Sequence, residues 1–148
     1  MCLITDKQVQ VAQTDITVYK LLHAQGDYKA RSIFQGFIYL LGETYSAPLG
    51  SDTYMITSYD HRDSAALSKK YPGWEYDTFE ELQKRGLTVY AQGFHSYSAK
   101  IKHLAIEDSE VWGQVYKCTI PKGSNYVEDL VGYVVSDQII INERLYNE

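Results

Sequence analysis

Most of the features that identify a function at once are missing from this chain of 148 residues. Its two cysteines, Cys2 and Cys118, have no CxxC spacing, so we expect neither a zinc site nor a disulfide framework, but a reducing compartment. No stretch approaches the roughly 20 apolar residues of a membrane span. The opening MCLITDKQVQ also lacks the basic and apolar regions of a secretory signal. These absences predict a soluble, cytoplasmic protein.

The fingerprints of the common catalytic classes are missing as well. There is no GxSxG nucleophile motif and no glycine-rich phosphate or dinucleotide loop. His61-Arg62-Asp63 resembles part of a kinase catalytic loop, but the downstream Asn, the DFG triplet and the glycine loop are absent. No His-x-x-x-His pair or carboxylate cluster suggests a metal site. Cys118 lies in an apolar, β-branched run that disfavours a thiolate. The sequence predicts no metal and no cofactor, and it favours a protein without catalysis.

Positive charge is in short supply, since 14 Lys and Arg stand against 19 Asp and Glu, a formal net charge of −5. This balance disfavours non-specific binding to nucleic acids or anionic membranes, although it leaves room for a local basic pocket. Hydrophobic residues make up 45% of the chain and charged residues 22%, as in ordinary globular proteins. We therefore expect one folded domain over residues 1–148.

Tyrosine is the one residue type in clear excess, with 14 copies against four Phe and two Trp. The simpler explanation is that Tyr replaces Phe at half-buried strand positions, where the ring packs and the hydroxyl stays hydrated. The alternative is a cleft whose rings stack on a flat ligand. The sequence leaves both explanations open.

Local patterns predict an α+β fold with a mostly antiparallel sheet. Residues 77–86 carry the signals of a short helix, with Asp77 as the expected N-cap and Gly86 at the end. A second helix is expected over residues 98–107, capped by Ser98. Alternating apolar residues and turn signals predict strands at residues 15–22, 33–41, 44–47, 54–59, 87–91, 111–120, 133–135 and 138–145.

The expected architecture is a single domain with two short helices and a split β cleft. Residues 60–86 are the most hydrophilic part, and they read as an insertion-like segment that ends in the first helix. Residues 23–32 are expected to be a loop, with Gly26-Asp27 as its turn.

One histidine coincides with a local structural signal. His95 follows Gly93 and Phe94, which predict a glycine-opened turn. There it either satisfies backbone groups or stands at a cleft mouth as an acid/base group, since an unperturbed imidazole has a pKa of ~6.5. Each basic residue alone is more simply a solvated charge, but several beside His95 would make an anion pocket. The candidate ligand-binding residues are Tyr19, Lys20, Arg31, His95, Tyr97 and Lys122.

The C-terminal part resembles small uncharacterised proteins of phages and prophages of gut bacteria. The likeness lies in the order of GFHSY (93–97), a helix, VYKCTIPKGSNY (115–126) and VVSDQIIINERL (134–145). These proteins share a G-[FY]-H turn followed by a C-terminal strand-turn-strand unit. The resemblance implies a phage-type accessory protein that acts against host defence in the host cell cytoplasm.

A more distant likeness is to the ADP-ribosyltransferase fold. It would make Tyr19-Lys20 the first-strand pair, His95-Ser96-Tyr97 the second-strand element and residues 138–143 the last strand. Lys20 stands where that family has Arg or His, and no E-x-E or Q-x-E presents a catalytic glutamate. If the protein is such an enzyme, the resemblance implies that His95 and Glu143 carry the activity.

Three functions follow as expectations. The first is a non-catalytic module that binds and sequesters a nucleotide-like small molecule. The alternatives are a protein-interaction module that inhibits a host factor, and an ADP-ribosyltransferase-like enzyme acting on NAD. The expected partner is thus a nucleotide-derived small molecule or a host protein, and the sequence leaves oligomerisation open. Neither nucleic acid nor a membrane is expected as a partner.

Overall fold

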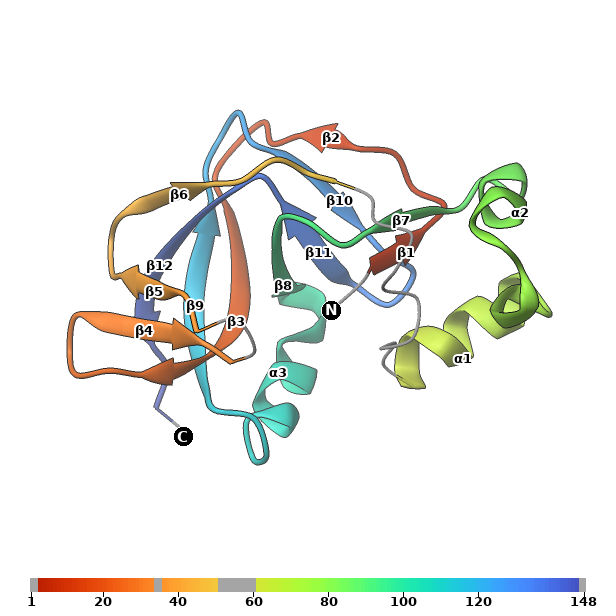
Figure 1. The fold of residues 1–148 in the computed structure, drawn as a ribbon. Coiled ribbons are helices and arrows are strands. Elements are labelled where there is room, and N and C mark those ends of the chain that lie inside the picture. Colours follow the sequence, from red (N-terminus) through yellow and green to blue (C-terminus); the bar gives the residue numbers. More distant parts are fainter. Residues whose placement is uncertain (1–2, 34–35, 51–60, 147–148) are drawn as a thin grey trace.

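Antiparallel pairing joins all the strands of the computed structural model, which describes residues 3–33, 36–50 and 61–146. The described residues form a ten-stranded, strongly twisted sheet and a separate two-stranded sheet (Figure 1). The α+β class and the mostly antiparallel sheet are therefore confirmed. No helix among these residues is long and apolar enough to cross a membrane.

Eight strands of the large sheet follow one another in a single path, and two more branch from it. β4 (Lys29–Ser32) pairs with β3, and β5 (Ile38–Leu40) pairs with β4. The path runs β2 (Gln10–Val11), β10 (Asn125–Glu128), β11 (Tyr133–Ser136), β8 (Phe94–Ser98), β3 (Ile16–Ala24), β9 (Gln114–Ile120), β12 (Gln138–Arg144) and β6 (Thr44–Ser46).

The structure corrects one predicted loop and adds one strand. Residues 23–32 are not a loop, because β3 continues to Ala24 and a turn at Gly26, with a φ of 76°, leads into β4. The turn after β9 leads into β10, which the sequence patterns did not indicate. The extended piece expected at residues 54–59 lies outside the described residues.

Side-chain alternation divides the large sheet into two apolar faces. On β3, Val18 and Leu22 pack into a core with Cys118 of β9. Tyr19 points to the opposite face, where it packs with Ala105 of the helix α3 (Lys102–Asp108). Cys118 is fully buried, and burial raises the pKa of its thiol to about 12, so it is a packing residue.

The helix expected over residues 98–107 is present as a short 3₁₀ turn, η2 (Ala99–Ile101), followed by α3. Ile101 and Ala105 are buried, as is usual for the apolar face of an amphipathic helix. Ser98 stands at the expected N-cap position before η2, but its side chain makes no capping hydrogen bond, so the predicted cap is wrong.

The helix expected over residues 77–86 is α2 (Phe79–Lys84). Its N-cap is Thr78 rather than Asp77, since the Thr78 hydroxyl accepts the backbone N–H of Glu81 at 3.2 Å. Asp77 forms an ion pair with Arg85 at 2.8 Å instead.

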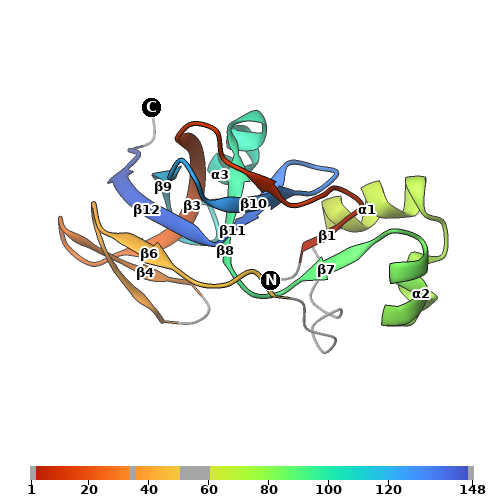
Figure 2. The same ribbon diagram turned by 90° about the horizontal axis from the view of Figure 1, so that it is seen from above.

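The polar segment 60–86 carries more structure than expected. It contains a further helix, α1 (His61–Lys70), and a 3₁₀ turn, η1 (Trp74–Tyr76), before α2. These elements pack beside the two-stranded sheet of β1 (Leu3–Thr5) and β7 (Thr88–Tyr90), next to the large sheet in both views (Figures 1 and 2). A third apolar cluster joins them, made of Ile4, Leu67, Trp74, Leu82, Leu87 and Val89.

Candidate functional site

The large sheet splits where β8 leaves β3. The two strands pair only at Val18 with Ser98 and at Tyr19 with Tyr97. The same edge of β3 next pairs with β4, beginning at Leu22. Lys20 lies between these two pairings on β3. Its side chain extends toward β8, where its Nζ donates a hydrogen bond to the His95 carbonyl at 2.7 Å. The expected split in the sheet therefore lies between β3 and β8.

A hollow of about 450 Å³ lies at this split. Lys20 of β3 and residues 91–95, which lead into β8, line one side of it. The other side is formed by Phe37 and Tyr39 around β5, and by Tyr45 to Pro48 in and after β6. Strands far apart in the sequence thus enclose a space whose volume is typical of small-molecule sites.

The wall of the hollow is aromatic. The ring of Tyr39 lies edge-on to those of Phe37, Tyr45 and Phe94, with centroid distances of 4.8, 5.2 and 6.3 Å. The Tyr45 hydroxyl accepts the backbone N–H of Leu40 at 2.7 Å, which ties β6 to β5. Burial raises the pKa of Tyr39 to about 12, so its hydroxyl stays neutral. These edge-to-face contacts hold the rings in place without a ligand.

Lys20 supplies a positive charge that no described residue neutralises. Among the described residues, no carboxylate forms an ion pair with it, and its one hydrogen bond goes to a neutral carbonyl. Burial lowers the pKa of its ammonium from 10.5 to about 8. The side chain still lines the hollow, so the charge is accessible from there. An ammonium has three N–H donors, and only one of them is used.

His95 lies in strand β8 and not in a glycine turn, which corrects the expected placement. The turn residue is Gly93, with a φ of 117°. The imidazole Nε2 lies 3.1 Å from the Ala91 carbonyl. Burial, together with the charge of Lys20, lowers the pKa of His95 to about 4. The ring is therefore neutral near pH 7 and held by the main chain. His95 lines the hollow but does not act there as an acid/base group.

Tyr19 and Tyr97 do not share this hollow, contrary to expectation. Tyr19 is buried on the other face of the sheet, with the Lys102 ammonium 5.2 Å from its ring centroid. The Tyr97 hydroxyl donates to Asp108 Oδ2 at 2.7 Å, and burial raises its pKa far above the usual value. Because successive strand residues point to opposite faces, the neighbour of Lys20 is turned away from it.

Tyr97 belongs to a network that attaches α1 to the sheet. Arg62 binds both carboxylate oxygens of Asp108 at 2.8 and 2.9 Å, and its Nη1 also donates to the Tyr133 hydroxyl at 3.1 Å. The rings of Tyr97 and Tyr133 lie 5.1 Å apart. A bidentate, partly buried arrangement of this kind is structural.

The remaining candidates are dispersed. Arg31 is exposed on β4, and Lys122 is exposed in the turn before β10. Glu143 is exposed at a bulge of β12, opposite Lys117. In the sheet, β3 and β9 separate β12 from the strand of His95. His95 and Glu143 therefore do not form a common site.

The aromatic wall is the part of the site that sequence reasoning missed. Phe37 and Tyr39 are two residues apart, and Tyr45 follows after the turn at Gly42. In strands, residues two apart share one face. This spacing within two predicted strands, in a chain rich in Tyr, was the available signal.

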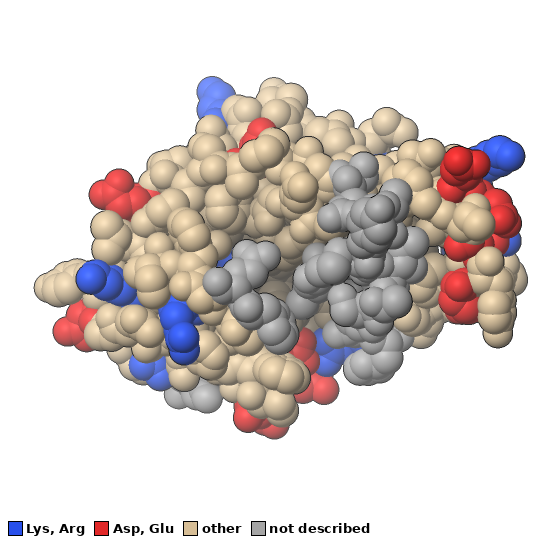
Figure 3. All heavy atoms as spheres, viewed as in Figure 1, with Lys and Arg blue, Asp and Glu red and all other residues tan. Residues whose placement is uncertain are grey.

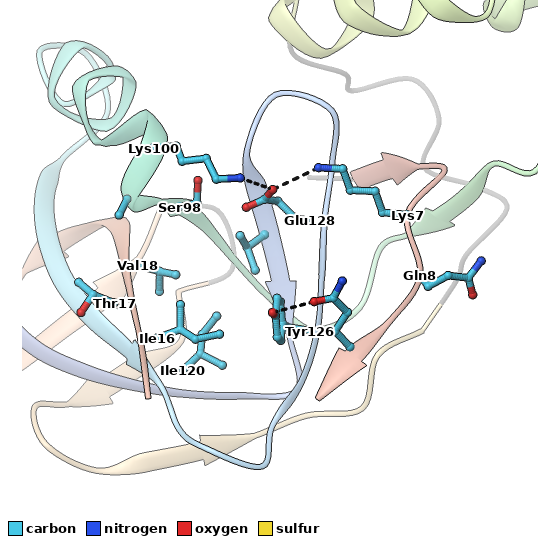
Figure 4. A pocket seen from close by; sticks show the side chains of 13 residues that line it. Lys7, Gln8, Ile16, Thr17, Val18, Ser98, Lys100, Ile120, Tyr126 and Glu128 are labelled. Carbon is cyan, nitrogen blue, oxygen red and sulfur yellow. Dashed lines mark hydrogen bonds and ion pairs between the residues drawn. The ribbon is translucent and has the colours of Figure 1, made fainter. Parts of the chain in front are cut away.

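A second hollow of about 410 Å³ lies between β2, β10 and the start of β3. Figure 4 shows Lys7 and Lys100 reaching toward Glu128 from two sides, with Nζ–Oε2 distances of 3.2 and 2.9 Å. The Tyr126 hydroxyl donates to Gln10 Oε1 at 3.0 Å. Glu128 offsets one of these two positive charges, and both lysines are exposed to solvent, which screens the other. This hollow therefore attracts an anion less than the one at the buried Lys20 does.

Charges of both signs occur on the face in Figure 3, with basic side chains over β4 and acidic ones over α2. Chemically, the hollow at Lys20 offers one unbalanced cation next to ring edges and faces. Comparison of the chain with models of known protein families, with curated proteins and with solved structures finds no match.

Proposed function

We propose that this protein binds a small molecule with an anionic group and a flat ring, of the nucleotide type, in the hollow at Lys20. It holds this molecule without changing it chemically. The observation that carries the proposal is a desolvated ammonium that faces a hollow with an aromatic wall and has no counter-charge within the described part of the chain.

The electrostatics favour an anionic ligand. Removing an ammonium from water is costly unless a partner balances it. The hydrogen bond to the His95 carbonyl offsets only part of that cost. A phosphate in the hollow would bring the missing charge and accept the two N–H groups that the protein leaves unused.

The rings favour a flat group next to that anion. Phe37 is 45% exposed, so its surface is available to a ligand, while Tyr39 and Phe94 form the deeper part of the wall. Aromatic rings of this kind stack on any of the nucleobases, because every base has a π-face. The ligand class is therefore a nucleotide or a nucleotide-derived signal.

Two observations support binding over group transfer. The His95 imidazole is neutral and bonded to the main chain, and Glu143 lies on a distant strand. In the phage setting that the sequence resemblance implies, the activity would be sequestration of a host nucleotide signal.

A protein-interaction module that inhibits a host factor remains the second candidate, and one surface supports it. β5 is an edge strand that pairs only with β4 among the described residues. Its Ile38 and Leu40 are exposed. Exposed apolar edge strands are common sites for pairing with another chain.

A thermal-shift and calorimetry panel of AMP, cyclic nucleotides, ADP-ribose and NAD tests the proposal. We expect at least one to raise the melting temperature with the logarithm of its concentration. Lys20→Met should abolish the shift, because it removes the cation. Lys122→Met is the matched control and should leave the shift unchanged. A panel without any response from the unaltered protein would contradict the proposal.

A further inference from the structure

We propose that Lys20 is also a covalent capture site, at which its amine forms an imine with an aldehyde that carries an anionic group and a flat ring. This inference rests on the proposed function, since it uses the same hollow and the same recognition. It adds a reaction at one atom, Lys20 Nζ, and a class of ligand, the ring-bearing anionic aldehydes.

The position of the amine suits this reaction. Lys20 Nζ is fixed by its hydrogen bond to the His95 carbonyl at 2.7 Å, at the side of a hollow large enough for a small ligand. The opposite side carries Tyr39 and Tyr45. A ligand whose ring lies against that wall is held with its other groups within reach of the nitrogen. The anion first pairs with the protonated amine, and the nitrogen attacks the aldehyde carbon only after this proton has been lost.

The protonation state suits it as well. Only a neutral amine has the lone pair that attacks a carbonyl, and no carboxylate among the described residues holds the proton on Lys20. Burial lowers the pKa of this amine to about 8. Near pH 7 its neutral fraction is then roughly 200-fold larger than that of an ordinary lysine with a pKa of ~10.4. Desolvation is a common means of activating amine nucleophiles.

Other lysines of the described chain lack this combination. Lys70 is paired with Asp6, which raises the pKa of the ammonium, and Lys7 and Lys100 are paired with Glu128. All three amines lie at the surface, outside the hollow. The reaction should therefore be selective for Lys20.

The step balances without any further reagent. The nitrogen lone pair attacks the carbonyl carbon, the C=O π electrons move to oxygen, and one amine proton is transferred to that oxygen, giving a carbinolamine. The hydroxyl then leaves and takes up the second amine proton, so one water is released and a C=N bond forms. Neither carbon nor nitrogen exchanges electrons with an outside oxidant or reductant, and hydrolysis reverses the reaction.

Pyridoxal 5′-phosphate is a suitable probe, because it combines an aldehyde, a flat ring and a phosphate. The full chain is incubated with one equivalent of the probe, the imine is reduced with borohydride, and peptide mass spectrometry locates the label. We expect Lys20 to be labelled at least about tenfold faster than any surface lysine at pH 7. The rate should rise as the pH passes through about 8. Pyridoxal without the phosphate should label Lys20 more slowly.

Two variants separate the imine from anion binding. Lys20→Arg keeps a positive charge but has no nucleophilic amine, so it should lose labelling and retain a nucleotide-induced thermal shift. Lys20→Met should lose both, while Lys122→Arg should lose neither. Circular dichroism confirms that each variant is folded, and the Lys20→Arg result stands by itself if Lys20→Met does not fold.

The outcomes distinguish the two proposals. Labelling spread evenly over surface lysines, or no label at Lys20 while nucleotides still bind, overturns the imine proposal alone. A label at Lys20 without any nucleotide response supports the imine and overturns nucleotide binding. Loss of both overturns both.

Discussion

At the scale of single residues, Lys20 combines a cost in stability with a use in binding. Its pKa is about 8 in the folded protein, below the unperturbed value of 10.5. The protonated amine therefore destabilises the fold fully below pH 8, and this effect disappears as the pH rises through 10.5. A shift of this size corresponds to about 3 kcal/mol. Residues that weaken the fold while facing a hollow are typical of functional sites.

Lys20→Met should therefore raise the free energy of unfolding at pH 7 by about 1–2 kcal/mol, after subtraction of about 1 kcal/mol for the lost hydrogen bond. The gain should shrink toward zero as the pH approaches 10.5, where the amine is neutral in the folded protein and half deprotonated in the unfolded protein. Urea denaturation at pH 7 and pH 10 measures it, and Lys122→Met is the exposed control. If the Lys20→Met variant is less stable than the unaltered protein at pH 7, other interactions compensate the cost of burying the ammonium, and the prediction is wrong.

The sequence predicted some of the residues that line the hollow, but it did not predict which residues lie next to them in space. Lys20 and His95 were both identified as candidates, and both line the hollow. Tyr19 and Tyr97 were placed beside them because they are adjacent in sequence. Tyr19 directly precedes Lys20, so the alternation of β3 turns its ring to the opposite face. Tyr97 lies two residues after His95 on β8, and its contacts with Asp108 and with the core under α3 hold its ring away from the hollow.

At the scale of elements, the entry into β8 depends on a glycine. A Cβ at Gly93 would lie 2.7 Å from Val135 Cγ2 and 3.1 Å from the Ser136 carbonyl oxygen, and the residue has a φ of 117°. Gly26 has a φ of 76°, but nothing lies within 4 Å of its Cβ position. Both glycines thus have a positive φ, which residues with a Cβ rarely adopt, but only Gly93 is also crowded by its neighbours.

Gly26→Ala should cost about 1–2 kcal/mol for the left-handed backbone alone. Gly93→Ala should cost about 3 kcal/mol or more, because strain and overpacking add. It should also weaken nucleotide binding, since Gly93 lines the hollow. Chemical denaturation and the thermal-shift panel measure the two effects. Equal costs at both positions would mean that β8 can move to relieve the crowding.

Elements with strong local signals were predictable. Helix-end signals located α2 and α3 although neither expected cap residue makes the capping bond, and alternation located β3, β9 and β12. α1 was missed because its sequence is mostly polar, and Leu67 is its one deeply buried residue among those whose side chains are described. A split in the sheet was expected, but the sequence did not say which strands separate. Its location between β3 and β8 depends on pairings between strands that are distant in the sequence.

At the scale of the whole molecule, the α1–α2 unit is attached to the large sheet from several sides. In β1, Leu3 packs into the core under α3, and its neighbour Ile4 packs into the third cluster. The Thr5 hydroxyl donates to the Glu128 carbonyl at 2.8 Å. Arg62 adds the bidentate contact to Asp108. These contacts should couple the unit to the sheet.

We therefore expect one cooperative unfolding transition. Trp74 is buried in the third cluster and Trp112 is half exposed, so Trp112→Phe leaves fluorescence that reports on Trp74 alone. The midpoint of Trp74 fluorescence should coincide with that of far-ultraviolet circular dichroism. An earlier fluorescence transition would show that residues 60–86 unfold as a separate unit.

The strand that carries Tyr45 has consequences for biosynthesis. β6 pairs with β12 and with no other described strand, and the Gly42 and Ala47 amides donate to the carbonyls of Ile141 and Asp137. One wall of the hollow is thus anchored to a strand that leaves the ribosome nearly 100 residues after it. A nascent chain stalled before residue 138 has no finished pocket, so capture of a ligand begins only after translation has passed that strand.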